Sequence, residues 1–295
     1  MNIFAIVVTY NGMQWADRCF SSLERSELPV QTIAIDNAST DGTPDYIKSH
    51  FPSVHLVESH ENLGFAKSNN IGFHYALDHG ADYVFLLNHD AWIFPNTLQA
   101  LVQTMEAHPD CGIATPIHLN GDSTAIDRRF CSALPPSFTS DLYYNHLQPI
   151  YELDHCNAAA WLISAACLKK IGGFDTSLFI HYGEDDNYCQ RVHYHHLRIL
   201  LNSTSTICHD RVSRDLDDSS RQMWKETIRK EEIAERWSNI NIDYPMRQIY
   251  RRLKLKRLLS LPLSSNRRSL NETLAICRQT MCSREINKQE GLHWL

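Results

Sequence analysis

The sequence predicts an α/β fold in which a mostly parallel sheet is flanked by helices. With 295 residues, 43% of them hydrophobic, the chain can form one large α/β domain and an appendage. Short apolar segments rich in β-branched residues alternate with segments whose apolar residues recur at helical spacing. Polar clusters follow three strands, at 9–11, 36–42 and 88–90. Because ligands bind beyond the carboxyl ends of such strands, we expect these clusters to form one pocket.

The first half of the chain repeats a unit of strand, polar turn and helix. In the first unit, Ala16, Cys19 and Phe20 recur at helical spacing. In the second unit, Thr43 supplies an N-cap and Pro44 suits the first helical position. The expected strands are 3–8, 32–35, 54–57 and 83–87, and a helix between the last two runs from about Phe65 to near Gly80.

The second half of the core is less regular. A strand at 113–117 precedes a stretch to about Pro149 without a clear period, which we interpret as a long loop region or lid. A strand-like pattern resumes at 155–164, a short helix is closed by Gly172-Gly173, and another helix starts at Glu184.

These elements divide the chain into two parts. We expect an α/β domain at 1–213, made of one half at 1–117 and a second half at 118–213. Apolar residues in amphipathic patterns predict a helical C-terminal extension at 214–295.

Composition limits the location of the protein. The apolar runs are far shorter than the roughly 20 residues that a membrane helix needs. No basic residue precedes the first apolar run and no small-residue cleavage site follows it, which argues against a secretory signal. The nine cysteines lack C-x-x-C spacing, which argues against a disulfide framework or a structural zinc site. We therefore expect a cytoplasmic protein with reduced thiols.

A basic segment at 247–268 contrasts with the acidic remainder of the chain. It holds eight Arg and Lys residues and no Asp or Glu, so the rest has 20 basic against 34 acidic residues. The interleaved Ile and Leu residues suit an interfacial helix on anionic lipid at the inner face of the membrane, at about 1 kcal/mol per basic residue. A helix for packing or homodimerisation with a solvated basic face explains the pattern equally well. Nucleic acid is a poorer explanation, because the body is acidic and no binding motif accompanies the charge.

Two polar segments have compositions suited to a nucleotide. Asp36-Asn37-Ala38-Ser39-Thr40-Asp41-Gly42 combines carboxylates, an amide and hydroxyls, which suit a base and ribose, although an Asx-type turn explains the segment too. Segment 61–72 combines Gly64 at a helix start, Lys67 for phosphate charge and paired asparagines at 69 and 70. The alternative is that Gly64 only allows the chain to enter the helix and has no role in binding a ligand.

Asp90 ends the most apolar strand, in the sequence Asn88-His89-Asp90. A carboxylate there is a good ligand for Mg²⁺ or Mn²⁺, and such a cation neutralises charge that develops on a leaving diphosphate. His89 could add a nitrogen ligand that favours Mn²⁺, or it could point away. A solvated strand-end Asp is the alternative.

Asp185 is the candidate general base. It starts a helix and shares its face with Tyr188, Cys189 and Val192, whereas Asp186 should point elsewhere. The helix macrodipole, worth about 0.3–1 kcal/mol per acidic residue, explains the acidity but not the inward direction. Desolvation would raise the pKa of Asp185 and the helix N-terminus would lower it, so the sequence leaves the sign of the shift open.

Taken in order, several motifs resemble glycosyltransferase family 2, especially its rhamnosyltransferase-like members. The motifs are VVTYN, IDNASTDGT, ENLGFAKSNNIG, LLNHD, AAAWLI, GGFD and HYGEDDNYCQRV, over about residues 1–213. The resemblance implies a GT-A fold, with a Rossmann-like, nucleotide-sugar-binding half at 1–117 and an acceptor and catalytic half at 118–213. It also implies inverting transfer from a UDP- or dTDP-sugar to a glycan or lipid-linked glycan, in the synthesis of cell-surface polysaccharide.

The resemblance further implies roles for individual residues. Ala160 and Trp161 belong to the acceptor side, where Trp161 could stack on a sugar face. Glu184 and Asp185 form the acidic motif whose Asp is the base. For nucleotide-sugar binding the implied residues are Thr9, Tyr10, Asn11, Asp36, Asn37, Asp41, Asn62, Gly64, Lys67, Asn70 and Asn88, and for the metal, Mg²⁺ or Mn²⁺, they are Asp90 and His209.

Two positions depart from the family pattern. The D-x-D metal motif reads Asn88-His89-Asp90, and Asn187 stands where relatives often have a second Asp. A catalytically silent nucleotide-sugar-binding protein is therefore an alternative. A dehydrogenase would need G-x-G-x-x-G after the first strand, where the chain has only Gly12. A sugar nucleotidyltransferase would need a glycine-rich, basic loop at the same turn.

Overall fold

The computed structural model describes residues 1–180, 182–211, 218–260 and 265–295. Residues 261–264 of the basic segment, and the expected boundary at 213–214, lie outside the described residues. The strands are β1 Ile3–Thr9, β2 Gln31–Asp36, β3 His55–Glu58, β4 Tyr83–Asn88, β5 Ala91–Ile93, β6 Cys111–Asn120, β7 Ile150–Leu153, β8 Ala160–Ser164 and β9 Arg198–His209. The helices are α1 Met13–Glu24, α2 Thr43–His50, α3 Gly64–Asp78, α4 Thr97–Ala107, α5 Pro136–Tyr143, α6 Ala165–Ile171, α7 Glu184–Tyr194, α8 Asp218–Ser238, α9 Met246–Leu259 and α10 Ser265–Asn287, with a 3₁₀ turn η1 at Phe130–Ala133.

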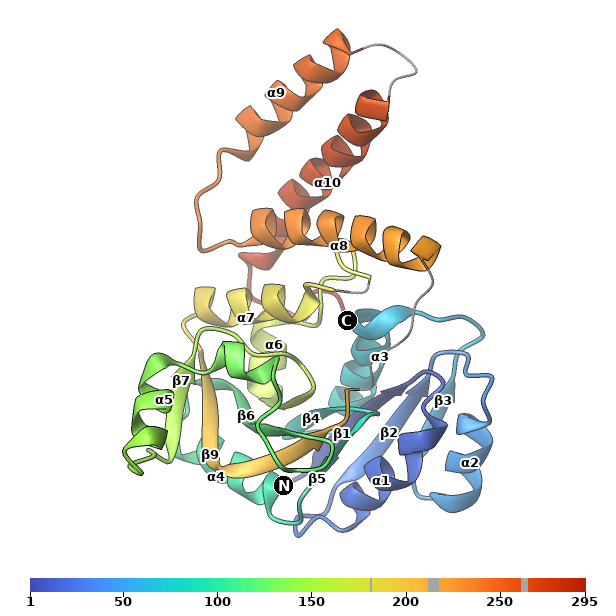
Figure 1. Ribbon diagram of the computed structural model, residues 1–295, viewed down its shortest axis with the longest axis vertical. Coiled ribbons are helices and arrows are strands. Elements are labelled where there is room, and N and C mark those ends of the chain that lie inside the picture. Colours follow the sequence, from blue (N-terminus) through green and yellow to red (C-terminus); the bar gives the residue numbers. More distant parts are fainter. Residues whose placement is uncertain (181, 212–217, 261–264) are drawn as a thin grey trace.

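The described strands form one sheet of nine strands in the order β3-β2-β1-β4-β8-β6-β9-β5, with β7 paired to β9 (Figure 1). The strands of the first half, β1 to β4, pair in parallel, as the repeated strand and helix units predict. In the second half β8 is antiparallel to both β4 and β6. The predicted α/β class is confirmed, and the second half adds a mixed part to the sheet.

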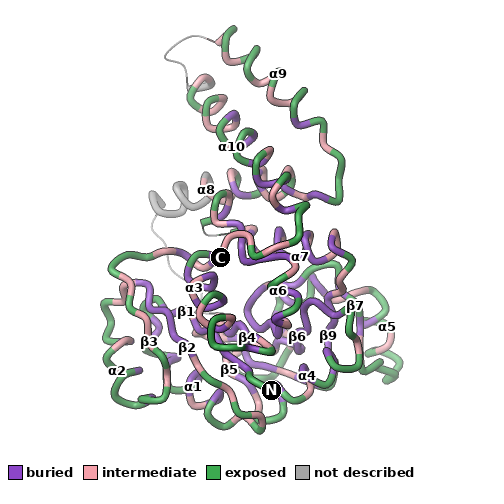
Figure 2. The backbone as a smooth tube through the Cα atoms, turned by 180° about the vertical axis from the view of Figure 1, so that it is seen from behind, coloured by how far each residue is buried: buried purple, intermediate pink, exposed green. Residues whose placement is uncertain are grey.

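Helices cover both faces of the sheet. Strand side chains alternate between the faces, so Ala5 and Val7 pack towards α1, α2 and α4, while Phe4 and Ile6 pack towards α3, α6 and α7. The apolar face predicted for the first helix is buried against the sheet. Figure 2 shows the buried residues concentrated in these central strands.

The stretch before Pro149 is more ordered than the sequence indicated. The expected loop region contains η1 and α5, and Pro136 takes a position in the first turn of α5, where its missing N–H is not needed. The strand expected at 155–164 begins only at Ala160. Residues 155–159 therefore form a loop that leads into β8, and the loop lies beside the end of β4, where Asn88 N donates to the carbonyl oxygen of Ala159.

Helices α8, α9 and α10 stand above the sheet domain, with α9 and α10 projecting as a helical hairpin (Figure 1). The lower end of α10 is tied to its surroundings. Arg284 donates to the carbonyl oxygens of Trp237 and Ile242 at 2.9 and 2.7 Å, and Ser283 donates to Asp175. In the described part of the chain, no helix combines the length and apolar character that crossing a membrane requires.

Candidate active site

The carboxyl ends of β1, β2 and β4 meet, because β1 pairs in parallel with both neighbours. The loops that follow are joined by hydrogen bonds. Asn11 N donates to Ser39 Oγ at 2.9 Å, and Thr40 N donates to Asn11 Oδ1 at 2.9 Å. Tyr10 N donates to Nδ1 of His89 at 3.2 Å, so this nitrogen of His89 already accepts a hydrogen bond. The three polar clusters therefore lie next to one another, as predicted, and their forming one pocket stays a prediction.

The acidic residues of the second cluster shape these loops. The buried Asp36 accepts hydrogen bonds from Thr9 Oγ1 at 2.7 Å and from Ser39 Oγ at 2.6 Å. Asp41 accepts from Thr43 Oγ1 at 2.5 Å. Burial would raise the pKa of Asp41, but hydrogen bonds from Thr43 and the backbone outweigh burial and hold it below its ordinary value. These are the bonds of the Asx-type turn left open as the alternative, and contact of these residues with a nucleotide stays a prediction.

Asn37 and Asn62 fix the entry to α3. Asn37 is buried and its Oδ1 accepts from Ser68 Oγ at 2.7 Å, while Asn62 Oδ1 accepts from Gly64 N at 2.9 Å. Gly64 has φ +79°, and a Cβ there would collide with the carbonyl oxygen of Ile180. Glycine is therefore required at this turn for two reasons, its backbone conformation and the close approach.

The structure does not bring Lys67 and Asn70 to the predicted site. Lys67 is exposed and lines a separate cavity beside α3, together with His74. Asn70 Oδ1 accepts from Phe174 N at 2.8 Å, and its Nδ2 donates to the carbonyl oxygens of Phe174 and Trp294, each at 2.9 Å. These bonds join α3 to the C-terminal residues, and a contact of Asn70 with a nucleotide sugar stays a prediction.

Asp90 and His209 form a close pair at the end of β9. Oδ1 of Asp90 lies 3.2 Å from Nε2 of the buried His209, and Nδ2 of Asn88 lies 3.5 Å from the same nitrogen. Burial would raise the pKa of Asp90, but the hydrogen bond and charge of His209 hold it below its ordinary value. Asp90 is therefore a carboxylate that stays ionised.

This pair fits a divalent cation as a partial ligand set. A carboxylate and an imidazole both bind Mn²⁺, and Nε2 is the nitrogen of His209 that faces Asp90. No group of three or more Asp, Glu, His and Cys side chains that could hold a metal occurs within the described ranges. A bound ion would take its remaining ligands from substrate oxygens and water, as Mg²⁺ and Mn²⁺ do at diphosphates.

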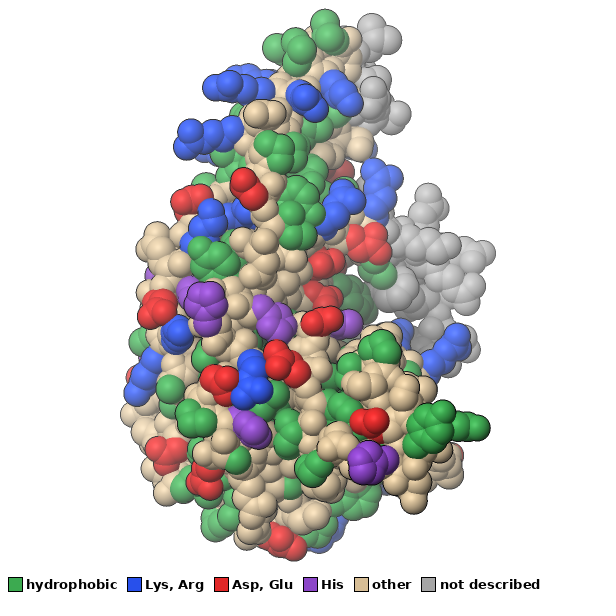
Figure 3. Space-filling model, turned by 90° about the vertical axis from the view of Figure 1, so that its left-hand side faces the viewer, with side chains coloured by type: hydrophobic (Ala, Val, Ile, Leu, Met, Phe, Trp, Pro, Cys, Tyr) green, Lys and Arg blue, Asp and Glu red, His purple; other side chains and the backbone are tan. Residues whose placement is uncertain are grey.

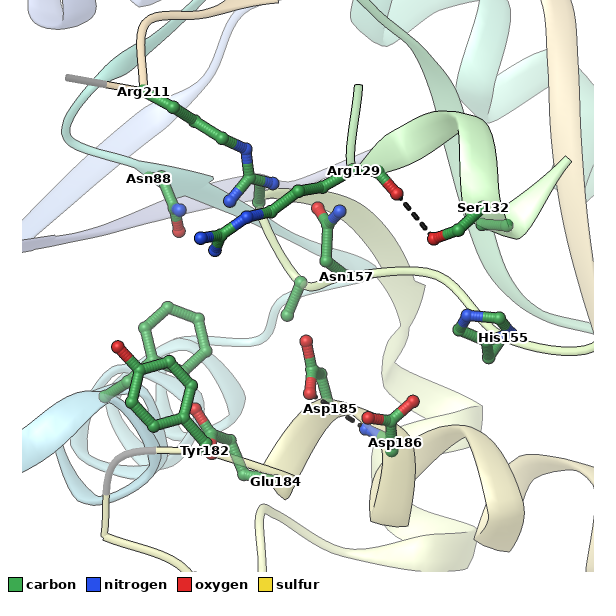
Figure 4. A pocket seen from close by; sticks show the side chains of 14 residues that line it. Asn88, Arg129, Ser132, His155, Asn157, Tyr182, Glu184, Asp185, Asp186 and Arg211 are labelled. Atoms are coloured by element: carbon green, nitrogen blue, oxygen red, sulfur yellow. Dashed lines mark hydrogen bonds between the residues drawn. The ribbon is translucent and has the colours of Figure 1, made fainter. Parts of the chain in front are cut away.

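A cavity of about 350 Å³ opens beside Asn88 (Figure 4). Of the residues predicted from the sequence, Asn88, Glu184 and Asp185 line it. The other polar residues of its lining are Arg129, Ser132, His155, Asn157, Tyr182, Asp186 and Arg211. The cavity therefore brings the end of β4 and the start of α7 to one space.

The start of α7 carries the acidic wall of this cavity. Glu184 is buried, and Asp185 and Asp186 are half-buried. Burial, with the neighbouring Asp185 carboxylate, raises the pKa of Glu184 to about 8. Burial, with the Asp186 carboxylate, raises the pKa of Asp185 to about 6, although its backbone hydrogen bonds act in the opposite direction. The sequence left open whether the pKa of Asp185 rises or falls. In the structure desolvation outweighs the effect of the helix N-terminus, and the pKa rises.

The direction of α7 is mostly as predicted. Tyr188, Cys189 and Val192 are buried, and Asp185 points into the cavity (Figure 4). Asp186 was expected to point elsewhere, yet it lines the same cavity. Successive residues of the first turn of α7 all line the cavity. Helical phase alone therefore does not predict that Asp185 faces the cavity and Asp186 does not.

Two arginines face the acidic wall across the cavity. Figure 4 shows Arg129 and Arg211 on the side of the cavity near Asn88 and away from Asp185 and Asp186, with Arg129 directed towards Asn88. The buried Asp127 holds both segments, because its Oδ2 accepts from Arg211 Nε at 3.1 Å and its Oδ1 accepts from Arg129 N at 3.1 Å. The cavity is therefore cationic on one side and anionic on the other.

The acceptor-side prediction needs a correction. Trp161 and Ala160 are each 0% exposed, and the Trp161 ring packs against Phe174 and Tyr188. Trp161 cannot stack on a sugar, because β8 directs it into the core. Ala158 and Ala159, just before the strand, line the cavity instead.

Sequence reasoning missed the two arginines and His155. Arg211 follows His209 by two residues, a spacing that could have drawn attention to it. Arg129 lies in the stretch without a clear period, where no pattern assigns a direction to a side chain. His155 precedes β8 in a segment that had been assigned to the strand.

Comparisons with known proteins show which sequences and structures this chain is similar to. The model of the family described as Glycosyl transferase family 2 matches residues 4–163. The dTDP-rhamnosyl transferase RfbF of Shigella flexneri is 24% identical over 191 residues, which are 64% of this chain and 62% of that protein. The N-acetylglucosaminyl-diphospho-decaprenol L-rhamnosyltransferase of Mycobacterium tuberculosis is 25% identical over 207 residues, which are 61% of this chain and 67% of that protein. The chain thus spans less than two thirds of the Shigella relative.

Solved structures share the fold at low sequence identity. The mannosyltransferase PcManGT of Pyrobaculum calidifontis, in complex with GDP-Man and Mn²⁺, has a TM-score of 0.51 and 16% identity over 97% of this chain and 72% of its own. GalNAc-T7 with UDP, GalNAc and Mn²⁺ has a TM-score of 0.63 and 13% identity over 100% and 55%. S. aureus TarS 1-349 with UDP-GlcNAc has a TM-score of 0.54 and 14% identity over 96% and 73%. The fold is GT-A.

Proposed function

The chain belongs to glycosyl transferase family 2, and from this premise we propose an inverting, metal-dependent transfer from a nucleoside diphosphate sugar to a hydroxyl of a glycan or lipid-linked glycan. The family and its rhamnosyltransferase relatives support a glycosyltransferase of glycan biosynthesis. One observation supports the proposed transfer most. A single cavity sets the half-buried carboxylate of Asp185 opposite the cationic side made by Arg129 and Arg211.

Asp185 is the proposed general base. Its pKa of about 6 lies below neutral pH, so the carboxylate is ionised there, yet it is a stronger base than an ordinary Asp. In a single displacement it takes the proton of the acceptor hydroxyl while the hydroxyl oxygen forms a bond to the anomeric carbon. The bond from that carbon to the diphosphate oxygen breaks, and the nucleoside diphosphate leaves with the electron pair. Attack from the opposite face inverts the anomeric carbon.

Arg129 and Arg211 are proposed to bind the diphosphate. A guanidinium forms charge-assisted hydrogen bonds with phosphate oxygens, and Asp127 holds the guanidinium of Arg211 and the backbone N of Arg129 beside the cavity. A divalent cation at Asp90 and His209 would supply further neutralisation of the leaving group. Tyr10, partly exposed beside these strand ends, is a proposed surface for the nucleoside.

The substrates are proposed from the relatives. The Shigella relative is a dTDP-rhamnosyl transferase, and the solved neighbours contain GDP-Man, UDP or UDP-GlcNAc. We therefore propose a dTDP- or UDP-sugar as donor. The Mycobacterium relative is named for a decaprenol diphosphate carrier, which supports a lipid-linked acceptor. We also retain the division into a transferase domain at 1–213 and a helical extension at 214–295.

A donor panel tests this function. Purified protein is heated with dTDP-rhamnose, UDP-sugars or GDP-mannose, each with and without Mn²⁺, and the melting temperature is recorded. We expect one donor class to raise the melting temperature, with a larger rise when Mn²⁺ is present. Stabilisation by nucleoside triphosphates, together with formation of a nucleotide sugar from sugar phosphate, would instead identify a nucleotidyltransferase.

A further inference from the structure

The outer face of α9 is the most unusual surface outside the active site. The helix carries six Arg and Lys residues and no Asp or Glu. Its partner in the chain is α10, and Ile249, Tyr250 and Leu253 on the side of this contact are half-buried. Only part of the helix is therefore used for packing within the described residues.

Large apolar side chains lie on the opposite side of α9. Leu255, Leu258 and Leu259 are 58%, 64% and 80% exposed. Their spacing of three and four residues places them on one face, and Arg252 and Lys254 flank that face on either side. The helix thus has two separate apolar faces, one towards α10 and one towards solvent.

The projecting hairpin presents this face away from the rest of the molecule. Figure 3 shows Lys and Arg side chains gathered over the upper part of the protein, with hydrophobic side chains at its tip and acidic side chains lower down. Leucines flanked by long cationic side chains match an anionic lipid surface, because the leucines enter the acyl boundary while the cations remain at the headgroups. A symmetric contact with a second copy would instead set like charges against one another.

We propose that the outer face of α9, defined by Arg251, Arg252, Lys254, Leu255, Leu258 and Leu259, docks on an anionic lipid surface. This surface lies outside the cavity and is independent of the proposed donor and acceptor. Two interactions contribute to the affinity for the membrane, insertion of the leucines and attraction of the cations to anionic headgroups. Replacing either set of residues should lower this affinity.

Vesicle sedimentation tests the proposal with the whole chain and no sugar substrate. Protein is mixed with phosphatidylcholine vesicles or with equal parts of phosphatidylcholine and phosphatidylglycerol. We expect binding to the anionic vesicles alone and weakening at high salt. Replacing Arg251, Arg252 and Lys254 with Gln should weaken binding about a hundredfold, since each cation contributes about fivefold. Replacing Leu255 and Leu258 with Ser should weaken it with the charge unchanged.

A matched control separates position from charge. Arg25, Lys169 and Arg278 are exposed elsewhere, and changing them to Gln removes the same charge. This control should bind anionic vesicles like the parent. The proposal would be overturned if the parent does not bind anionic vesicles, or if the α9 variants bind them as well as the parent does. It would also be overturned if light scattering shows a dimer of the parent that the leucine variant no longer forms. Because no transfer is measured, failure here leaves the proposed glycosyl transfer intact.

Discussion

Asp90 and Asp185 are carboxylates at the two sides of one functional region, and their surroundings act on them in opposite directions. Burial favours the protonated form of both. At Asp90 the hydrogen bond and charge of His209 outweigh burial, and the pKa falls. At Asp185 the adjacent carboxylate of Asp186 adds to burial, and the pKa rises to about 6.

This difference separates two tasks. A carboxylate with a lowered pKa remains an anion and suits a cation ligand, whereas one with a raised pKa accepts a proton near neutral pH. In the proposed mechanism the same residue type therefore serves the leaving group on one side and the acceptor hydroxyl on the other. Each prediction below changes one side and leaves the other in place.

The largest effect is expected at the metal side. Asp90→Asn keeps the shape of the side chain and removes its charge, so transfer should fall about a thousandfold through loss of the cation's contribution. Mn²⁺ should also no longer improve donor binding, measured by titration calorimetry. Asp122→Asn, on the exposed loop after β6, is the control. Unchanged metal dependence in Asp90→Asn would show that the cation binds elsewhere.

A smaller loss is expected at the cationic wall. Arg129→Gln and Arg211→Gln should each lower transfer about ten- to a hundredfold and weaken inhibition by nucleoside diphosphate, because a charged hydrogen bond is lost. Arg128 is the matched control, since it is the exposed neighbour of Arg129 and does not line the cavity. An Arg128→Gln variant as impaired as Arg129→Gln would exclude a specific diphosphate contact.

The pH dependence of transfer sharpens the comparison. Asp185 acts as a base only when ionised, and burial with Asp186 raises its pKa to about 6. Transfer under subsaturating substrate should therefore decrease about tenfold per pH unit below about 6. Rates should be measured with the metal saturating at each pH. A rate that stays constant down to pH 4 would contradict a base with a raised pKa.

The smallest effect concerns stability at Glu184. Its pKa is raised by burial and by Asp185 to about 8, so the folded protein binds a proton that the unfolded chain has released between pH 4.5 and about 8. Stability therefore decreases as pH rises through this window. Glu184→Gln, which cannot ionise, should melt like the parent near pH 4.5 and at a higher temperature near pH 8.5. Glu24→Gln, at an exposed position, should show no such pH-dependent gain.

The sequence predicted the fold well because alternation of strands and helices is a local signal. The parallel order of β1, β2 and β4, the meeting of their carboxyl ends and the start of α7 at Glu184 are all observed. The stretch before Pro149 was not predictable in the same way. Its short elements, η1 and α5, are too brief for a period to appear.

Individual site residues were harder to predict, because the direction of a side chain depends on tertiary packing. Asn70 and Trp161 have chemistry suited to a ligand, yet Asn70 bonds to Phe174 and Trp161 lies in the core. Arg129 carries no pattern of its own and reaches the cavity only because Asp127 holds its loop. The motif residues Asn88 and Asp185 were found because strand ends and helix starts are placed by the fold itself.

Donor binding and transfer in Asp185→Asn, compared with Asp186→Asn, test the central claim most directly. Both variants remove one charge from the same turn of α7. We expect Asp185→Asn to bind the donor with metal as the parent does, while transfer falls a hundredfold or more, about the contribution of a general base. Asp186→Asn should keep most of the transfer. Near-normal transfer in Asp185→Asn, or an equal loss in both variants, would contradict the assignment of Asp185 as the base.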